Sequence, residues 1–514
     1  MNGADSLVET LIAGEVEVCF TNPGTSEMHI VAALDRRPEL RCVLTLFEGV
    51  ATAAADGYAR MTEKPACTLL HLGPGLANGL ANLHNASRAH VPIINIVGQH
   101  ATFHIPLDTP LTSDIEGIAR PYSKWIKTAS SSCLVGHDTA GAIEAARTPP
   151  GQIATLIVPT DVAWSPGAAA PQMPVIPEPP LPPTATIETL AEKLKAVPNS
   201  GLLLAGNALY GAGLKAAGRI AAALRTRLFA PYPFRRLQRG AGTPLVERIP
   251  YVLEQAVDFL KDIRLLVLVG AEPPIAYFAS PDKSSAFTSP QCEICWLSQP
   301  EEDCTGALEA LAEALGVGRT APVAEPSHTT PVPSGSITLN GIAAAIAALL
   351  PENSIVVDES MTSGRAILPA TRGATPHDFL ANTGGSIGIA FPLAVGAAVA
   401  CPDRRVLCLS ADGSGMYTLQ ALWTMAREGL NITNVVFANR SYAVLKREFS
   451  YLGVGNPGSR ALDLMEIDRP SLDWVSLARG MGVPAQRITS LDELAQGLRN
   501  GFAADGPALI EIPL

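Results

Sequence analysis

The most constraining feature of the sequence is the stretch Cys401–Leu445, which reads CPDRRVLCLSADGSGMYTLQALWTMAREGLNITNVVFANRSYAVL. Two short apolar runs within it, at 406–409 and 432–437, predict buried parallel strands. The residues between them, at about 417–428, have the pattern of a helix. A strand, a turn, a helix and a second strand in this order predict part of an open parallel sheet with helices on its faces.

Oxygen-bearing side chains follow both predicted strands. Asp412 lies in an Ala-Asp-Gly-Ser-Gly turn after the first strand, and Asn439 follows the second, 27 residues later. Ligands of open parallel sheets gather at the carboxyl ends of the strands, so these two residues are expected to be neighbours. An Asp, an Asn and a backbone carbonyl suit Mg²⁺, which also takes phosphate oxygens. The alternative is an Asp that caps the next helix and an Asn in a turn.

This pattern resembles the metal–diphosphate motif of thiamine diphosphate enzymes, in which Gly-Asp-Gly is followed, one helix and one strand later, by Asn-Asn. Ala411 and Ala438 depart from that motif, but the two ligating side chains are kept. The resemblance implies that Mg²⁺ is bound by Asp412, Asn439 and the main-chain carbonyl of Ser441. It also implies that thiamine diphosphate is contacted by Gly413, Ser414 and Tyr442.

The length and two proline-rich segments indicate several domains. A chain of 514 residues is expected to form about three domains. Repeated strand–helix units predict an α/β fold with three doubly wound parallel-sheet domains. The predicted order is a pyrimidine-binding domain at 1–165, a Pro-rich linker at 166–186, a central domain at 187–318, a linker at 319–336 and a diphosphate-binding domain at 337–514.

Charge and composition exclude several classes of protein. A formal charge of −11 leaves no basic stripe for binding nucleic acid. No apolar run approaches the roughly 18 residues of a membrane-spanning helix, and the first residues do not resemble a signal peptide. Nine scattered cysteines show no disulfide framework, and the Cys292–Cys295 pair lies in a predicted strand without a second pair to complete a metal site. A cytoplasmic protein that binds neither nucleic acid nor membranes is expected.

Glu48 lies where a predicted strand meets an Ala-rich helix, in the run EGVATAAADGYAR. An acidic residue at a helix N-terminus is also favoured by the helix dipole alone. The whole run, however, resembles the segment of thiamine diphosphate enzymes that activates the aminopyrimidine. There the glutamate bonds a ring nitrogen and so promotes deprotonation of the thiazolium carbon, and the cofactor acts as an electron sink when CO₂ leaves a 2-oxo acid.

Two further turns carry residues of the implied cofactor site. The turn NTGGSIG precedes an apolar helix, and the resemblance assigns the carbonyl of Gly385 to the exocyclic amine, with Ser386 beside it. Ile387 is expected to hold the cofactor in its bent shape, although plain core packing is the alternative. Thr362 and Ser363 follow an earlier strand and are expected to place their hydroxyls near the diphosphate.

His71 follows a predicted strand in LLHLGPG and is the first residue of a glycine-rich loop expected at 71–79. A lone histidine at a strand end is often only structural, but this segment resembles benzoylformate decarboxylase, where a histidine here transfers protons. Thr25 stands where that enzyme has a substrate-binding serine. The second active-site histidine of that enzyme has no match at 230–239. His100 and His104 lack the spacing of the paired histidines of pyruvate decarboxylases but could line the pocket.

The resemblance therefore implies a thiamine diphosphate- and Mg²⁺-dependent lyase or carboligase acting on a 2-oxo acid as a homodimer or homotetramer, with benzoylformate decarboxylase-like activity favoured. The alternatives are an acetolactate synthase-like carboligase and an inactive scaffold that binds the cofactor. A nicotinamide-dependent dehydrogenase lacks its Gly-x-Gly-x-x-Gly motif here. FAD is not expected, because the middle of the chain shows no dinucleotide-binding fingerprint.

Overall fold

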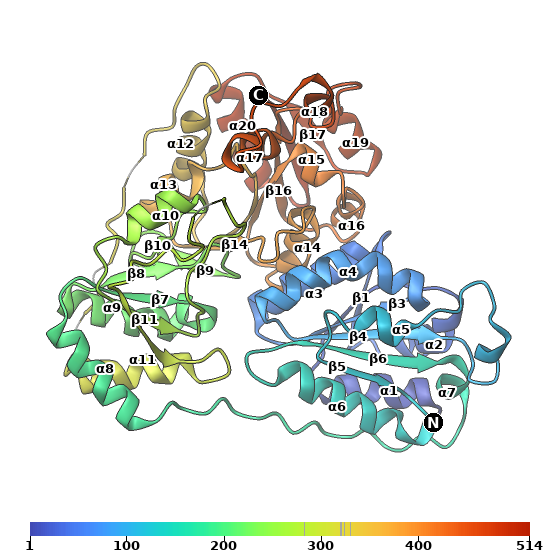
Figure 1. Cartoon of the computed structure of the whole chain (residues 1–514). Coiled ribbons are helices and arrows are strands. Elements are labelled where there is room, and N and C mark those ends of the chain that lie inside the picture. The colour runs from blue at the N-terminus through green and yellow to red at the C-terminus, as the bar shows by residue number, and fades with distance from the viewer. Residues whose placement is uncertain (282, 319–320, 323, 329) are drawn as a thin grey trace.

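A computed structural model describes residues 1–281, 283–318, 321–322, 324–328 and 330–514. Three α/β units are built around three sheets (Figure 1). The N-terminal sheet has the strand order β2-β1-β3-β4-β6-β5, the central sheet β10-β8-β7-β11-β12 and the C-terminal sheet β17-β18-β16-β15-β13-β14-β9. The predicted doubly wound, parallel α/β architecture is confirmed.

The N-terminal unit alternates strands and helices, and all of its strand pairs are parallel. Its strands are β1 (Val18–Asn22), β2 (Arg41–Leu44), β3 (Ala66–Leu70), β4 (Ile93–Gln99), β5 (Trp125–Thr128) and β6 (Ile153–Pro159). Its helices are α1 (Gly3–Ala13), α2 (Met28–Asp35), α3 (Glu48–Thr62), α4 (Leu72–Ala89), α5 (Ile115–Ala119), α6 (Val135–Arg147) and α7 (Thr160–Trp164), with 3₁₀ turns η1 (Thr25–Glu27), η2 (Ile105–Leu107) and η3 (Ser132–Leu134).

The central unit also alternates strands and helices. Its strands are β7 (Ser200–Leu204), β8 (Arg227–Ala230), β9 (Leu237–Arg239), β10 (Glu247–Arg248), β11 (Leu265–Val269) and β12 (Glu293–Ser298). Its helices are α8 (Thr184–Ala196), α9 (Gly211–Leu224), α10 (Leu253–Leu260) and α11 (Cys304–Ala314), with the 3₁₀ turn η4 (Gly206–Leu209). β9 leaves this unit and pairs antiparallel with β14 of the C-terminal sheet, so the two units share a sheet edge.

The C-terminal unit is parallel apart from β9. Its strands are β13 (Ser354–Glu359), β14 (His377–Ala381), β15 (Val406–Ala411), β16 (Ile432–Ala438), β17 (Ala485–Arg487) and β18 (Ala508–Pro513). Its helices are α12 (Leu339–Leu349), α13 (Ile367–Ala370), α14 (Ala390–Ala400), α15 (Asp412–Gly415), α16 (Ala421–Arg427), α17 (Ala443–Tyr451), α18 (Ser459–Asp463), α19 (Trp474–Gly480) and α20 (Leu491–Ala503), with the 3₁₀ turn η5 (Thr371–Gly373).

Two local predictions differ from the structure. The expected glycine-rich loop at 71–79 is helical from Leu72, because α4 tolerates Pro74 in its first turn, where backbone N–H groups need no helical partner. The helix expected at 417–428 is observed as the shorter α16, and the separate short helix α15 precedes the expected range. Tyr417 lies in the turn between α15 and α16, where its Cβ would lie 2.4 Å from a side-chain carbon on Gly388.

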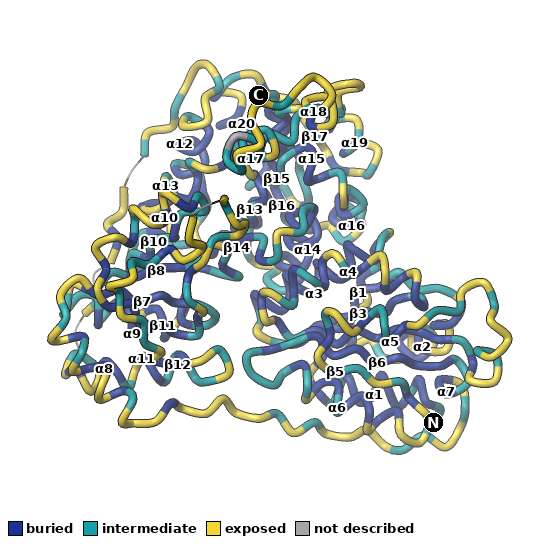
Figure 2. The backbone as a smooth tube through the Cα atoms, in the orientation of Figure 1, coloured by how far each residue is buried: buried dark blue, intermediate teal, exposed yellow. Residues whose placement is uncertain are grey.

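The proline-rich segment between α7 and α8 runs exposed along the outside of the molecule, as its yellow trace in Figure 2 shows. α8 begins at Thr184, inside the predicted linker 166–186. The predicted linker 319–336 lies partly outside the described residues, at 319–320, 323 and 329. None of the described helices is both long and apolar enough to cross a membrane.

The N-terminal and C-terminal units pack through α3 and α14. A side-chain carbon on Gly57 would lie 2.2 Å from the Leu393 carbonyl oxygen, and one on Gly396 would lie 1.9 Å from that of Ala54. These glycines therefore allow the two backbones to touch. The pairs 57–393 and 54–396 run in opposite directions along the chain, so α3 and α14 are antiparallel.

A buried ion pair holds the same interface. Arg60 donates two hydrogen bonds of 2.7 Å to the Asp56 carboxylate, and both side chains are fully buried. The same guanidinium donates to the carbonyl of Ala381 at 2.7 Å and to the hydroxyl of Thr383 at 3.0 Å. Burial raises the pKa of Asp56, whereas the adjacent Arg60 acts to lower it. The end of α3 is thereby fixed to the segment that follows β14.

Candidate active site

The first group of predicted residues lies at the carboxyl ends of β13, β14, β15 and β16, which are neighbours in the C-terminal sheet. Gly388, after β14, accepts a hydrogen bond of 2.6 Å at its carbonyl from Thr418. A side-chain carbon on Gly388 would lie 3.3 Å from the Ser414 carbonyl oxygen. The loops after β14 and β15 therefore meet at one edge of the sheet, where an open α/β sheet binds its ligands.

Asp412 and the turn at Asn439 are joined directly. The Asp412 carboxylate accepts a hydrogen bond of 2.7 Å from the backbone N–H of Arg440 and one of 2.9 Å from that of Gly413. Asn439 accepts a bond of 3.1 Å at its side-chain oxygen from the N–H of Ser441. Burial raises the pKa of Asp412, and the Arg440 N–H acts to lower it. The predicted proximity of the two strand ends is thus observed.

The remaining residues of the predicted diphosphate site surround Asp412. Gly413 and Ser414 are buried in α15, and the ring of Tyr442 packs over Gly413, leaving only 2.7 Å for a side-chain carbon there. Ser441 donates its hydroxyl proton to the Met465 carbonyl at 3.1 Å. Thr362 is half-buried and Ser363 buried, in the turn after β13. No cluster of three or more His, Cys, Asp or Glu side chains suited to a metal occurs in the described part of the chain.

The turn after β14 is shaped by its own amides. Gly385 has a φ of +81°, which favours glycine, and its N–H donates to the Asn382 side chain at 2.9 Å. The carbonyl of Ser386 accepts bonds of 2.8 Å from Asn382 and from Asn85 of α4. Ile387 is half-buried, so it is not an ordinary core residue.

Glu359, at the end of β13, anchors this turn and was not among the predicted site residues. Its carboxylate accepts hydrogen bonds of 3.0 Å from Asn382, 3.1 Å from the N–H of Gly388 and 3.2 Å from that of Ala390. The side chain is 3% exposed. Burial raises the pKa of Glu359 to about 7, against the effect of these bonds. The sequence signal that could have identified Glu359 is an acidic residue at the end of an apolar strand.

The second group lies after the carboxyl ends of β2, β1 and β3, which are neighbours in the N-terminal sheet. Glu48 begins α3, is 6% exposed and accepts hydrogen bonds from the side-chain amides of Asn22 at 3.1 Å and Asn78 at 2.9 Å. A side-chain carbon on Gly75 would lie 3.4 Å from both the Glu48 carboxylate and the Cβ of His71. Glu48 and His71 are therefore separated only by this glycine.

His71 is paired with a buried carboxylate that was also missed. Its Nδ1 lies 2.8 Å from Oε2 of Glu27 and 3.1 Å from the Ser26 hydroxyl. Glu27 is fully buried and accepts further bonds from Ser26 and from the N–H of Gly24. Thr25 is exposed, beside this cluster. Glu27 follows Gly24 by three residues, the spacing of a residue that reaches back to cap a helix start.

Two other regions approach these groups. The rings of His100 and His104 have centroids 5.5 Å apart. Burial lowers the pKa of His100, and the charges of His104 and His71 lower it further. From the central unit, the phenol of Tyr277 lies 3.7 Å from the position of a side-chain carbon on Gly385. The central unit thus reaches the turn that contains Gly385 through a tyrosine outside 230–239.

Within one chain the two groups are connected through α4. The Asn82 amide donates a hydrogen bond of 2.8 Å to the carbonyl of Gly49, next to Glu48, and Asn85 donates to the Asn82 side chain at 3.0 Å and to the Ser386 carbonyl at 2.8 Å. Glu48 begins α3, whereas Arg60, near the end of α3, bonds Thr383 beside the turn that contains Gly385. Twelve residues of helix separate Glu48 from Arg60, which corresponds to about 18 Å at 1.5 Å per residue. The turn that contains Gly385 is therefore linked to the end of α3 through Arg60 and to its start through Asn82 and Asn85 of α4.

The donor set fits the implied ligands. Asp412, the Asn439 amide and main-chain carbonyls are hard oxygen ligands of the kind that Mg²⁺ binds together with phosphate oxygens. Glu48 lies in a nearly dry setting, where it could share a proton with a ring nitrogen. Thiamine diphosphate requires both kinds of group: hard oxygen ligands for the metal at its diphosphate and a buried carboxylate at its pyrimidine ring.

Two family models match the chain. Residues 1–115 match the thiamine pyrophosphate enzyme N-terminal TPP binding domain, and residues 363–512 match the C-terminal TPP binding domain. These ranges contain Glu48 and Asp412 respectively.

Curated relatives and solved structures agree with these matches. A Mycobacterium tuberculosis protein provisionally named acetolactate synthase large subunit IlvX is 48% identical over 100% of this chain and 99% of its own length. Benzoylformate decarboxylase of Pseudomonas aeruginosa is 28% identical over 96% of this chain and 95% of its own. The thiamine diphosphate-dependent 4-hydroxybenzoylformate decarboxylase of Rhodococcus jostii has the same fold, with a TM-score of 0.86, 23% identity and coverage of 99% of this chain and 98% of its own. The chain belongs to the thiamine pyrophosphate enzyme family.

Proposed function

We propose that the protein is a thiamine diphosphate- and Mg²⁺-dependent enzyme that decarboxylates a 2-oxo acid without oxidation, in the manner of benzoylformate decarboxylase. The observation that carries this proposal is the pairing of His71 with the buried Glu27, one glycine away from Glu48. A positioned acid–base pair beside the activating glutamate suits protonation of a carbon that has just lost CO₂. Thr25, exposed beside the pair, is proposed to contact the substrate.

In this proposal Mg²⁺ is held by Asp412, Asn439 and the carbonyl of Ser441. The diphosphate end of the cofactor is contacted by Thr362, Ser363, Gly413, Ser414 and Tyr442, and the pyrimidine end by Gly385, Ser386 and Ile387. Bound thiamine diphosphate supplies a carbon nucleophile and an electron sink for the carboxylate-derived electrons. Glu48 holds and releases a proton at the pyrimidine ring, helped by two amides that fix its carboxylate.

A homodimer completes the site in this proposal, either alone or within a homotetramer. The resemblance to thiamine diphosphate enzymes supports it, because in that family the activating glutamate and the diphosphate site of one cofactor come from different subunits. A second copy, related by a two-fold axis, can bring its own Glu48 to the Gly385 turn of the first. Each dimer would then hold two equivalent sites.

The second candidate function is an acetolactate synthase-like condensation of two 2-oxo acids. The 48% identical relative, which bears that name, favours it. Both reactions begin with the same loss of CO₂, and they differ in whether a proton or a second 2-oxo acid meets the resulting carbon. The presence of His71, paired with Glu27, favours protonation of this carbon.

Product analysis separates these functions. The protein, with thiamine diphosphate and Mg²⁺, is incubated with pyruvate and, separately, with benzoylformate. CO₂ together with the corresponding aldehyde supports the decarboxylase, and acetolactate from pyruvate supports the carboligase. Cofactor binding without release of CO₂ from a wide panel of 2-oxo acids would instead indicate the inactive scaffold.

A further inference from the structure

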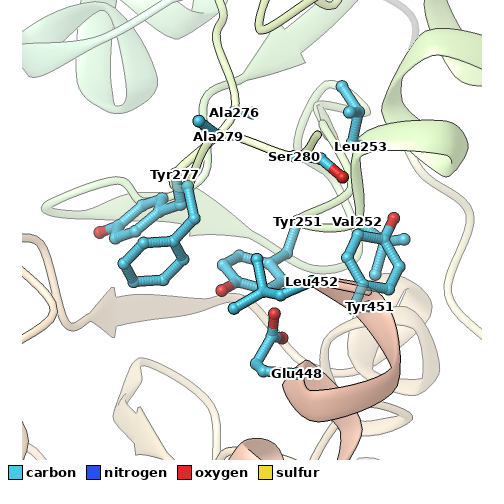
Figure 3. A pocket seen from close by; sticks show the side chains of 11 residues that line it. Tyr251, Val252, Leu253, Ala276, Tyr277, Ala279, Ser280, Glu448, Tyr451 and Leu452 are labelled. Carbon is cyan, nitrogen blue, oxygen red and sulfur yellow. The ribbon is translucent and has the colours of Figure 1, made fainter. Parts of the chain in front are cut away.

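A pocket lies between the central unit and α17 (Figure 3). Its central-unit wall is aromatic, and the tilted rings of Tyr251 and Tyr277 have centroids 5.7 Å apart. Glu448 and Tyr451 of α17, and Leu452 directly after it, line the opposite wall. α17 starts directly after Tyr442, and Tyr277 lies beside Gly385, so both walls continue from the proposed cofactor site.

Arg447 of α17 carries a charge that the described residues do not balance fully. Its Nε and Nη1 are buried, and neither has a hydrogen-bond partner in the part of the chain that the structure describes. Its Nη2 lies 3.4 Å from Oε1 of Glu448, which is a long contact. Buried N–H groups without an acceptor cost free energy, so an acceptor is expected when the protein is at work.

A second unpartnered group lies on α17. The hydroxyl of Tyr451 is also buried and without a partner among the described residues. Residues four apart on a helix lie on one face, so Arg447 and Tyr451 share a face of α17. Two neighbouring donors, one of them charged, match an anionic acceptor with more than one oxygen.

The acids Asp358 and Glu359 accept hydrogen bonds from groups other than Arg447. The pKa of Tyr232 is raised mainly by burial; Arg248 and Arg447 act to lower it, and Asp358 and Glu359 to raise it. The charges of Arg447 and of Glu359, which anchors the turn after β14, thus act on the pKa of the same phenol, that of Tyr232. Asp358 accepts from the N–H of Ser360 at 3.0 Å, and Glu359 is saturated by the turn, so neither is free for Arg447.

We propose that Arg447, with Tyr451, binds a carboxylate of the substrate at the edge of the aromatic pocket. The inference rests on the proposed function, which makes the substrate a 2-oxo acid. The carboxylate is either the one next to the 2-oxo group or a second acid group on the substrate side chain. A guanidinium suits both, because it offers several N–H donors in one plane.

The test measures binding without turnover. Lactate and malate carry one and two carboxylates but no 2-oxo group, so they serve as probes. Their dissociation constants are measured by titration calorimetry on the full chain with thiamine diphosphate and Mg²⁺. We expect Arg447→Gln to weaken binding about 10- to 100-fold, Arg447→Lys to weaken it less, and Tyr451→Phe by a few-fold. Arg460→Gln, on the exposed surface of α18, is the matched control and is expected to bind as the wild type.

The two probes distinguish the sources of the carboxylate. Weaker binding of both lactate and malate by Arg447→Gln assigns the arginine to the carboxylate common to all 2-oxo acids. Weaker binding of malate alone assigns it to a second acid group. Either result supports the site, provided that circular dichroism shows the variant folded; if it is not, Arg447→Lys and Tyr451→Phe carry the test.

Three results would overturn the inference: probe binding unchanged in the folded variant, a wild type that binds neither probe, or a variant that loses only self-association. Loss of self-association alone would mean that an acidic residue of a second copy is the hydrogen-bond partner of Arg447. A wild type that binds the probes through Arg447 but turns over no 2-oxo acid would refute the proposed function and leave the site standing.

Discussion

His71 and Glu27 form a pair in which Nδ1 lies 2.8 Å from Oε2, with the carboxylate fully buried. A buried acceptor fixes which ring nitrogen carries the proton and leaves the other free to act. In the proposed decarboxylase this pair is the proton-transfer device beside Glu48.

Glu27→Gln is therefore expected to lower kcat about 10- to 1,000-fold while thiamine diphosphate still binds, because an amide cannot stabilise a protonated imidazole. His71→Ala should lower kcat at least as much, and the double variant should lose little more than the worse single one. Steady-state kinetics with the substrate found by product analysis provide the measurement. Independent, multiplying losses would show that the two residues do not act together.

Glu48→Gln is expected to abolish most turnover, by about 10²- to 10⁴-fold, because the amide cannot exchange a proton with the pyrimidine. Glu63→Gln is the matched control, since Glu63 is exposed immediately after the other end of α3. Release of CO₂ from the 2-oxo acid is the readout. Full turnover in Glu48→Gln would rule out the assigned role.

Asp412→Asn is expected to weaken Mg²⁺-dependent binding of thiamine diphosphate at least 10-fold, because one anionic ligand is lost from a site that must hold a divalent cation. Asp403→Asn, exposed in the turn before β15, should bind as the wild type. Calorimetric titration with and without a chelator measures the effect. Equal affinity in both variants would place the metal elsewhere.

A mixed population tests the dimeric site. Glu48→Gln and Asp412→Asn chains, each inactive alone, are expected to regain about a quarter of wild-type activity when co-expressed, because half of randomly paired dimers are hybrids with one intact site. Activity is compared with that of the separately expressed variants mixed after folding. No recovery from co-expressed chains that are shown to form hybrids would mean that each chain uses its own Glu48.

The pH dependence of stability should report Glu359. Its pKa is raised by burial to about 7 from the 4.5 of an exposed glutamate, so the folded protein holds this proton more tightly. The stability from this proton is fully present below about pH 4.5 and is lost as pH rises through about 7, a change of roughly 3 kcal/mol. The free energy of unfolding of the wild type should therefore fall relative to Glu359→Gln between pH 5 and about 8. A constant difference would show that Glu359 is ionised throughout this range.

The sequence by itself determined the fold class and much of the chemistry. Alternating apolar runs and helical segments specify parallel sheets, and residues such as Asp412 and Glu48 stand at strand ends, where short-range pattern and chain order suffice to place them. Local rules misplaced two helix starts: α4 already begins at Leu72, with Pro74 in its first turn, and α16 begins only at Ala421.

Only the tertiary structure decided which distant residues meet. Glu27 approaches His71 across 44 residues, Tyr277 reaches Gly385 from another unit, and Arg447 is left without partners for two of its nitrogens among the described residues. Such contacts depend on how sheets and helices pack, which no local pattern encodes. The contact of Gly57 with the Leu393 backbone has the same origin, and it lets α3 pack directly on α14.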